Sequence, residues 1–343
     1  MKELIRRIEE SDFEHAAPLF KVPYKKSIEE LKWLFKDPND KNEYNGFVCI
    51  SNEELVGVIG YIDVSYTDGT VDFKGVIPMS WQLKENYKGF AGILLFKKVL
   101  ALGDFCIAIA GSSTAKQMYP MFKYRYLFNI YEYYKVLDLK SSFCLITKKG
   151  RLKSLAKLLW LNTARFRINI KFKKTRNVVF ENYNQTEEQI KEINYGIIRR
   201  KLNKNQINWF LKCPLVKSMA FKVYLDESFL GYVILYIKSQ DGCNQGRIVH
   251  LPYVDDKHLS YEIFHKCLQI LKKHKCSFVS SWLHHDAHSS SLKNHGFKRI
   301  KNKIIPFYLK DKRNVFENHN LDNWFLQYSE GDKAYRNFPF FSV

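Results

Sequence analysis

A weak internal repeat constrains the fold of this 343-residue chain more than any other feature. The motif WLFKDP at residues 33–38 recurs as WFLKCP at residues 209–214, about half a chain length later. The motif LVG at 55–57 is followed in the same way by FLG at 229–231, at nearly the same spacing. Two motifs that recur in the same order predict two domains of one fold.

Each half mixes predicted helices and strands, which is typical of a mixed α/β fold. In the first half, S-x-x-E capping boxes at Ser11 and Ser27 predict two helix starts. Polar turns at 51–54 and at Asp68–Gly69 predict hairpins. The other predicted elements of this half are strands at 47–50, 55–64, 76–83, 105–110 and 130–137 and helices at 89–102 and 114–122.

The second half is predicted to repeat this order. The predicted strands are 178–183, 220–225, 229–237, 248–254 and 278–282, and the predicted helices follow Thr186 and span 259–274 and 289–294. We therefore predict an N-terminal domain over 1–140, a connector helix over 141–177 and a C-terminal domain over 178–343.

The charge of +20 is concentrated at the centre of the chain. Residues 139–180 contain twelve lysines and arginines and no acidic residue. The apolar residues of 151–167 recur at helical spacing, so the segment predicts a basic amphipathic helix. We favour a connector that packs its apolar face on a domain. The alternative is that residues 148–176 contact an anionic membrane surface or a nucleic acid.

Cysteine usage and hydropathy indicate the compartment. Seven cysteines without paired metal-ligand spacing are typical of a reduced, cytoplasmic protein. The N-terminus lacks the apolar core of a secretory signal, and no apolar run reaches the roughly 20 residues of a membrane span. We expect Cys213, Cys243, Cys267 and Cys276 to be buried. The sequence HHDAH at 284–288 is interpreted as a polar loop, so no metal site is predicted.

A turn rich in small residues separates a predicted strand from a predicted helix at LKENYKGFAGI, residues 83–93. Small side chains let backbone amides approach a ligand, and a helix N-terminus adds positive partial charge. The turn is therefore a candidate pyrophosphate site. The alternative is that its glycines serve only helix packing.

The order of elements resembles the fold of the GCN5-related N-acetyltransferase (GNAT) superfamily. The sequence YKGFAG at 87–92 resembles the loop of that family that binds the pyrophosphate of acetyl-CoA. The later sequence SSTAKQMY at 112–119 resembles a second motif of that family. The resemblance implies that Tyr119 protonates the departing CoA thiolate. It implies a donor site for acetyl-CoA at Leu83, Lys88, Gly89, Phe90, Ala91, Gly92, Ile93 and Ser112. No general base is identified, and Asp63, Asp72 and Glu85 are the candidates.

The second half also resembles a GNAT domain and ends its last helix with Gly296-Phe297. Its counterpart of the phosphate loop, PYVDDKHL at 252–259, has no glycine and carries Asp255 and Asp256. Two carboxylates repel a pyrophosphate, so we predict that this copy does not bind CoA.

The whole chain resembles tandem-GNAT proteins of bacterial surface-polysaccharide loci, including its Asn-Trp-Phe sequence at 323–325. The resemblance implies acetyl transfer to the amine of a small-molecule acceptor, such as a nucleotide-linked sugar. Two alternatives stay open. One is a Fem-type peptidyltransferase that uses aminoacyl-tRNA, and the other is a non-catalytic scaffold or peripheral membrane protein.

Overall fold

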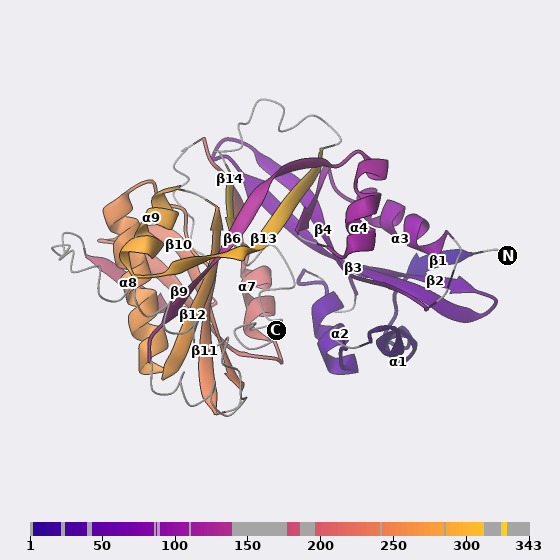
Figure 1. Ribbon diagram of the computed structural model, residues 1–343, viewed down its shortest axis with the longest axis horizontal. Helices are drawn as coiled ribbons and strands as arrows, with labels where there is room; N and C mark the ends of the chain where they lie inside the picture. Colours follow the sequence, from indigo (N-terminus) through magenta and orange to yellow (C-terminus); the bar gives the residue numbers. More distant parts are fainter. Residues whose placement is uncertain are drawn as a thin grey trace.

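The computed structural model describes most of the two halves of the chain. The described residues are 3–21, 25–39, 43–85, 87, 90–109, 111–138, 177–185, 196–240, 242–284, 286–311 and 324–327. They form one continuous mixed sheet of 14 strands with helices on both faces (Figure 1), which confirms the predicted fold class. The connector helix predicted over 141–177 lies outside the described residues, apart from its last residue.

The first half begins with a short strand and a helical pair and ends with a long strand. Its elements are β1 (Leu4–Arg7), α1 (Asp12–Ala16), the 3-10 helix η1 (Ala17–Leu19), α2 (Ile28–Phe35), β2 (Gly46–Ser51), β3 (Glu54–Thr67), β4 (Asp72–Leu83), α3 (Ala91–Leu100), β5 (Phe105–Ile109), α4 (Ser113–Met118), the 3-10 helix η2 (Pro120–Phe122) and β6 (Arg125–Val136). The strands and helices predicted for this half are all present, with ends shifted by a few residues.

The second half repeats the element order of the first. Its elements are β7 (Val178–Asn182), β8 (Ile198–Lys201), α7 (Lys204–Leu211), β9 (Lys217–Leu225), β10 (Ser228–Gln240), β11 (Cys243–His250), α8 (Lys257–Lys273), β12 (Cys276–His284), α9 (Asp286–Asn294), β13 (Lys298–Asp311) and β14 (Trp324–Gln327). The series from α7 to β13 matches the series from α2 to β6. The helix predicted after Thr186 lies outside the described residues. In the described part of the chain, no helix is long and apolar enough to cross a bilayer.

Local sequence signals explain several of these boundaries. Ser27 caps α2, because its Oγ accepts a hydrogen bond from the backbone N–H of Glu30 at 3.0 Å. Asn52 and Glu53 have φ angles of 50° and 65°, as a tight hairpin turn between β2 and β3 requires. One predicted strand needs correction. The strand predicted over 248–254 is β11, which begins earlier and ends at His250, where its pairing with β10 stops.

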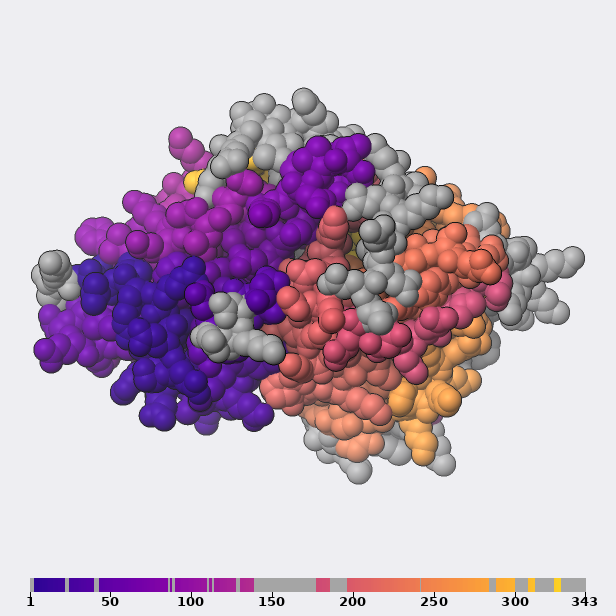
Figure 2. Space-filling model, turned by 180° about the vertical axis from the view of Figure 1, so that it is seen from behind, coloured from indigo at the N-terminus to yellow at the C-terminus, as the bar shows by residue number. Residues whose placement is uncertain are grey.

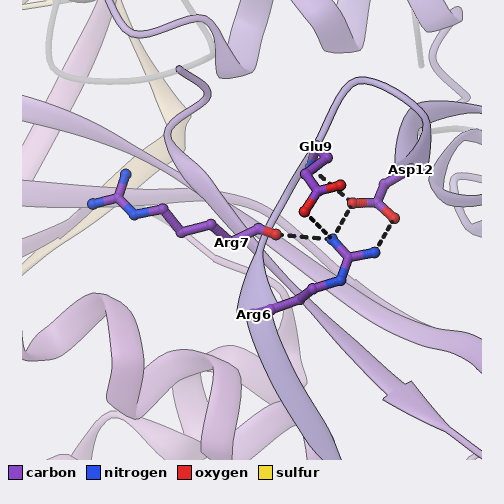
Figure 3. Close-up of polar contacts among 4 residues, drawn as sticks. All are labelled: Arg6, Arg7, Glu9 and Asp12. Carbon is purple, nitrogen blue, oxygen red and sulfur yellow. Dashed lines mark hydrogen bonds and ion pairs between the residues drawn. The ribbon is translucent and has the colours of Figure 1, made fainter. Parts of the chain in front are cut away.

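The capping box predicted at Ser11 is wrong. Ser11 has helical backbone angles and its side chain makes no capping hydrogen bond. The neighbouring carboxylate of Asp12 instead accepts from the backbone N–H of Glu9, which precedes the helix, at 2.8 Å. Arg6 of β1 donates two hydrogen bonds of 2.7 Å to the same carboxylate, while the Arg7 side chain points away (Figure 3). This bidentate pair joins β1 to α1, and a serine hydroxyl cannot make it.

The two halves exchange strands β6 and β13. Strand β13 of the second half lies between β5 and β6 of the first half and pairs antiparallel with both. Strand β6 of the first half pairs in turn with β12 of the second half. Figure 1 shows β6 and β13 crossing the middle of the molecule between the two lobes. Each half therefore completes the sheet of the other, and the chain folds as one body.

Three apolar clusters fill the molecule. An outer cluster packs α3 and α4 on one face of β2 to β5, and a second outer cluster packs α8 and α9 on the sheet of the second half. The third cluster, which we call the shared core, takes residues from α1, α2 and α7 and from the inner faces of both sheets. The two halves meet over a broad front in the space-filling view (Figure 2).

Trp33 and Trp209, which begin the two repeat motifs, stack on each other in the shared core. Their ring centroids are 4.8 Å apart and their planes differ by 8°. Trp33 Nε1 donates to the backbone O of Trp209 at 3.0 Å, and Trp209 Nε1 donates to the backbone O of Trp33 at 2.9 Å. Equivalent residues thus make the same contact in both directions, as residues do across a twofold axis.

This reciprocity generates a prediction about stability. Trp33→Phe and Trp209→Phe each keep an aromatic ring but remove one of the two hydrogen bonds to a buried carbonyl, which keeps its backbone donor. Each should therefore lower the free energy of unfolding by about 0.5–1.5 kcal/mol. The double variant should lose less than the sum, because both changes damage one mutual contact. Urea unfolding measures this. As a control, Trp33→Phe is combined with Trp81→Phe, which lies in the outer cluster of α3 and α4, and these two losses of stability should add. Additive losses for Trp33→Phe and Trp209→Phe would contradict the interpretation.

Candidate active site

Strands β4 and β5 diverge in the first half. They run parallel but pair only at Gly75–Phe105 and Val76–Cys106, although both strands continue beyond these pairs. Within the described residues, no other strand pairs with β4 on the side that β5 leaves. We call this divergence the first fork. Its two strands turn backbone N–H and C=O groups toward each other, and an extended ligand can pair with such edges.

A β-bulge distorts β4 along the first fork. Met79 pairs with Gly60 and Gln82 pairs with Val58, so two residues of β4 oppose one residue of β3. Ser80, within the bulge, has a φ of 51°, a left-handed conformation that is unfavourable for a residue with a side chain. Bulges redirect side chains and are frequent next to active sites. Strained backbone of this kind points to a functional position.

Helix α3 is the next element after β4, and its described N-cap residue, Phe90, makes no side-chain capping hydrogen bond. Its first turn contains no acidic residue. The first helical hydrogen bond runs from Leu94 N to Phe90 O at 2.9 Å, so the amides of Ala91, Gly92 and Ile93 precede it. These amides, with the positive end of the helix dipole, suit an anionic ligand.

Tyr119 lies at the end of α4 and reaches the carboxyl end of β5. Its side chain is 5% exposed. A Cβ atom on Gly111 would lie 2.5 Å from the Tyr119 hydroxyl, and Gly111 has a φ of 99°, so only glycine fits there. Burial raises the pKa of Tyr119, and the neighbouring Cys106 and Tyr308 add to the shift. The phenol therefore stays protonated at neutral pH and is suited to act as an acid.

The second half contributes a residue to this site. Tyr308, on the exchanged strand β13, lies with its ring centroid 4.7 Å from that of Tyr119. The ring centroid of Tyr124 lies 5.2 Å from that of Tyr119, and the Tyr124 hydroxyl donates to Cys106 Sγ at 2.8 Å. Sequence reasoning missed Tyr308. The aromatic, apolar run around it is typical of a strand, but its partner strand is far away in the sequence.

The equivalent divergence in the second half is filled by the chain itself. Strands β11 and β12 pair from Asn244–Cys276 to Ile248–Ser281 and then separate, and we call this the second fork. Strand β14 pairs with β12 there, on the side facing β11. The buried Gln327 of β14 bridges to the other arm of the fork.

The carboxamide of Gln327 makes two hydrogen bonds with the backbone of Leu251. Its Oε1 accepts from Leu251 N at 2.8 Å and its Nε2 donates to Leu251 O at 3.0 Å. Its Nε2 also lies 2.9 Å from Nδ1 of His250, and burial together with the positive charge of Arg200 lowers the pKa of His250 to about 3. The imidazole is therefore neutral and accepts this hydrogen bond.

The N-terminus of α8, beside the second fork, is capped by a carboxylate of the chain itself. Asp256 caps α8, and its Oδ1 accepts from the amides of His258 at 2.8 Å and Leu259 at 3.0 Å. The first-turn amides of α8 thus bind a carboxylate of the chain itself, whereas the N-cap residue of α3 supplies no such group. The sequence predicted that the carboxylates of Asp255 and Asp256 repel a pyrophosphate here, and the structure adds that Asp256 is the cap of α8.

Comparisons with solved structures agree with this architecture. A candidate acetyltransferase from Pyrococcus horikoshii matches with a TM-score of 0.53 and 12% identity, over 97% of this chain and 95% of that chain. A GCN5-related N-acetyltransferase from Anabaena variabilis matches with a TM-score of 0.56 and 9% identity, over 91% and 73% of the two chains. The chain has the GNAT fold.

The Saccharomyces cerevisiae N-myristoyltransferase, in a structure with bound myristoyl-CoA, also matches this GNAT fold. Its TM-score is 0.55 at 13% identity, and the match covers 91% of this chain and 79% of that chain. No protein-family model matches the sequence, and no curated protein is detectably similar to it. The similarity therefore lies in three-dimensional structure and concerns the GNAT fold.

The residues predicted to hold the donor take different places around the first fork. Leu83 ends β4, Ala91 and Gly92 are buried in the first turn of α3, and Ile93 is half-buried. Phe90 is 70% exposed. Ser112 is exposed and caps α4, since its Oγ accepts from Ala115 N at 3.1 Å. Lys88 and Gly89 lie outside the described residues.

Gly92 has a packing function that can be seen directly. A Cβ at this position would lie 3.0 Å from Leu83 Cδ1 and 3.3 Å from Trp81 Cζ2, so the glycine lets α3 approach β4 closely. Close approach brings the uncapped helix N-terminus to the end of the first fork. The packing role and the ligand role of this glycine are therefore compatible.

The three candidate bases differ sharply in environment. Glu85 forms an ion pair with Lys21, and Asp72 forms one with Lys201 at 2.9 Å, both on the surface. Asp63 lies on β3 opposite Val76, at the level where the first fork opens. Burial raises the pKa of Asp63 to about 6, and the nearby negative charge of Asp37 adds to the shift.

Several cysteines and histidines of the second half are buried. The predicted burial of Cys213, Cys243, Cys267 and Cys276 is confirmed, and all four are free thiols. His288 is buried, with Nδ1 2.6 Å from Ser260 Oγ, and His285 lies outside the described residues. Among the described side chains, no cluster of three or more His, Cys, Asp or Glu is arranged to hold a metal ion.

The contact between Gly111 and Tyr119 can be tested with a matched glycine. Gly242 also has a positive φ, of 79°, but a Cβ there would meet nothing within 4 Å. Both Gly111→Ala and Gly242→Ala incur backbone strain of about 1–3 kcal/mol. Gly111→Ala should lower the free energy of unfolding further, because its Cβ meets the Tyr119 hydroxyl. Adding Tyr119→Phe removes this hydroxyl and should restore part of the lost stability. Chemical unfolding gives the values, and no rescue by Tyr119→Phe would show that the contact is unimportant.

The raised pKa of Asp63 predicts a pH-dependent stability. Because the folded state binds this proton more tightly than the unfolded chain does, the folded state gains stability as pH falls from about 6 toward 4. Asp63→Asn should therefore be more stable than wild type at pH 8, and the difference should vanish near pH 4. Urea unfolding at both pH values measures it. Asp72→Asn, at an exposed ion pair, should show no such gain, and equal stability of Asp63→Asn and wild type at pH 8 would refute the assignment.

Proposed function

We propose that this protein is an N-acyltransferase that moves an acyl group from an acyl-CoA donor to an amine, with the donor in the first fork. The observation that carries the proposal is the contrast between the two forks. The first fork has two diverging strand edges, an uncapped helix N-terminus and a protonated tyrosine. In the second fork, β14 and Asp256 occupy the same positions.

The residues of the first fork fit the chemistry of such a donor. The amides at the start of α3 would bind the pyrophosphate, and the edges of β4 and β5 would pair with the amide groups of the pantetheine arm. Acetyl-CoA is the donor we expect from the sequence resemblance. The similarity to an N-myristoyltransferase supports the class of donor, an acyl-CoA, without selecting the length of the acyl chain.

The reaction requires one bond to form and one to break. The amine nitrogen attacks the thioester carbonyl carbon, and backbone N–H groups along β4 stabilise the negative charge that develops on the oxygen. The carbon–sulfur bond then breaks. Tyr119 supplies a proton to the sulfur, so the products are an amide and a free thiol. The proton that the amine loses goes to solvent water, because Val76, the cross-strand partner of Asp63, packs with α3 and places Asp63 on the donor side of the sheet.

The amine must approach from the face of the sheet opposite α3. The helices α3 and α4 pack on one face of β4, whereas α1 and α2 lie on the other (Figure 1). A donor bound at the start of α3 occupies the first face. The acceptor site is therefore proposed on the α1–α2 side, where a nucleotide-linked sugar amine is one acceptor that fits the sequence resemblance.

Other proposals depend on a different part of the chain. A role for tRNA, in a Fem-type peptidyltransferase, and a role for anionic lipid both rest on the basic residues 148–176. These residues lie outside the described part of the structure. The geometry of the first fork gives those alternatives no additional support, so the acyl-CoA proposal is preferred.

Replacing Tyr119 should separate chemistry from binding. Tyr119→Phe should lower kcat by about 10²-fold or more for acyl transfer, because the leaving thiolate loses its acid. The KM for acetyl-CoA should change little. The reaction is followed by the free thiol it releases in the presence of an amine panel, and calorimetry measures acetyl-CoA binding.

A neighbouring tyrosine provides the control. Tyr124→Phe removes an equally buried hydroxyl that donates to Cys106, and its kcat should stay close to that of wild type. If wild-type protein does not bind acetyl-CoA, the proposed function fails. If both variants lose activity equally, the specific role of Tyr119 fails.

A further inference from the structure

A buried lysine lies next to the bulge of β4. Lys26 comes from the segment between η1 and α2 and is only 3% exposed. Its Nζ donates a hydrogen bond to Ser80 Oγ, on the residue with the left-handed backbone. Its Nζ also lies 4.7 Å from the centre of the Phe20 ring. Among the described residues, Lys26 makes no other hydrogen bond and no ion pair.

The contacts of Lys26 do not compensate its charge. A buried ammonium group usually has a carboxylate partner, because removing an ion from water costs several kcal/mol. One hydroxyl and one aromatic ring return only part of that cost. Two exposed lysines of the same region differ from Lys26, since Lys21 pairs with Glu85 and Lys32 pairs with Glu10 at 2.7 Å, both at the surface.

Lys26 lies on the acceptor side of the first fork. Phe20, Ile77 and Met79 belong to the shared core, on the α1–α2 face of β4. Trp81 and Leu83 pack with α3 on the opposite face. The Lys21–Glu85 ion pair holds the start of the Lys26 segment against the end of β4. The ammonium group is thus beside the reacting edge of β4, on the face away from the uncapped start of α3.

We infer that the acceptor amine carries an anionic group, a carboxylate or a phosphate, which binds the ammonium group of Lys26. This inference rests on the proposed function and names the class of its acceptor. The anion would supply the charged partner that Lys26 does not find among the described residues, and it would hold the amine near the first fork. The pyrophosphate of the donor is a poor candidate for this partner, because its proposed site is on the other face.

A purely structural role for Lys26 predicts the opposite effect on stability. If Lys26 served to hold Ser80 in the bulge, Lys26→Met would destabilise the protein. If its charge is uncompensated, the isosteric and neutral methionine should stabilise the protein without ligand. Ser80 is half-exposed, so water can replace the lost donor.

The first experiment is therefore thermal unfolding without substrate. Lys26→Met should raise Tm by about 2 °C or more relative to wild type. Lys84→Met, at an exposed lysine that pairs with Glu54 at 2.5 Å, is the matched control and should not raise Tm. A fall in Tm for Lys26→Met would overturn the inference.

The second experiment compares amines that differ only in charge. Acyl transfer from acetyl-CoA is measured for β-alanine against β-alaninamide and for phosphoethanolamine against ethanolamine. Wild type should favour the anionic member of at least one pair by tenfold or more in kcat/KM, and the preferred pair separates carboxylate from phosphate. Lys26→Met should lose this preference, whereas Lys26→Arg should keep most of it. Equal use of charged and neutral amines by wild type would overturn the inference.

A third measurement separates this inference from the proposed function. Binding of acetyl-CoA, measured by calorimetry, should be the same for Lys26→Met and wild type, because the two sites lie on opposite faces. If no amine is acylated, the proposed function fails. The anion site is then decided by Tm alone, since β-alanine or phosphoethanolamine should stabilise wild type but not Lys26→Met. Stabilisation of neither protein overturns the inference.

Discussion

The antiparallel pairing of β6 with β13 is the interaction on which the rest of the structure depends. Each strand belongs by sequence to one half and completes the sheet of the other half. The exchange removes two sheet edges and fixes the inner faces of both halves opposite each other, where they bury the shared core. The reciprocal contact of Trp33 and Trp209 lies in that core and obeys the same twofold relation.

The duplicated architecture has two forks that differ in physical state. In the first fork the strand edges diverge and the helix that follows lacks a side-chain cap. In the second fork the carboxamide of Gln327 bridges the arms, and the carboxylate of Asp256 caps the helix. The chain thus bridges these polar groups with its own side chains in one copy, and the described residues do not do so in the other. The second copy provides stability to the assembly and the strand that carries Tyr308.

Sequence reasoning succeeded where the determining interactions are local. The cap at Ser27 and the turn at Asp68 depend on bonds between residues two or three positions apart, which a sequence displays directly. It failed at Ser11, because the chain already turns from Glu9 onward and gives Ser11 a helical backbone, which does not suit an N-cap residue. It gave neither the exchange of β6 and β13 nor the burial of Lys26, since both depend on partners that are distant in sequence. The donor-site residues named from the sequence stay predictions.

The strand exchange also sets the order in which this protein can mature during synthesis. The space between β5 and β6 can be filled only after the ribosome has made residues 298–311, near the end of the chain. Until then the nascent first half exposes two strand edges and lacks the tyrosine that packs against Tyr119. Its contacts of long sequence separation imply slow folding. A truncated translation product would therefore expose unpaired strand edges, which favour aggregation, and would lack Tyr308.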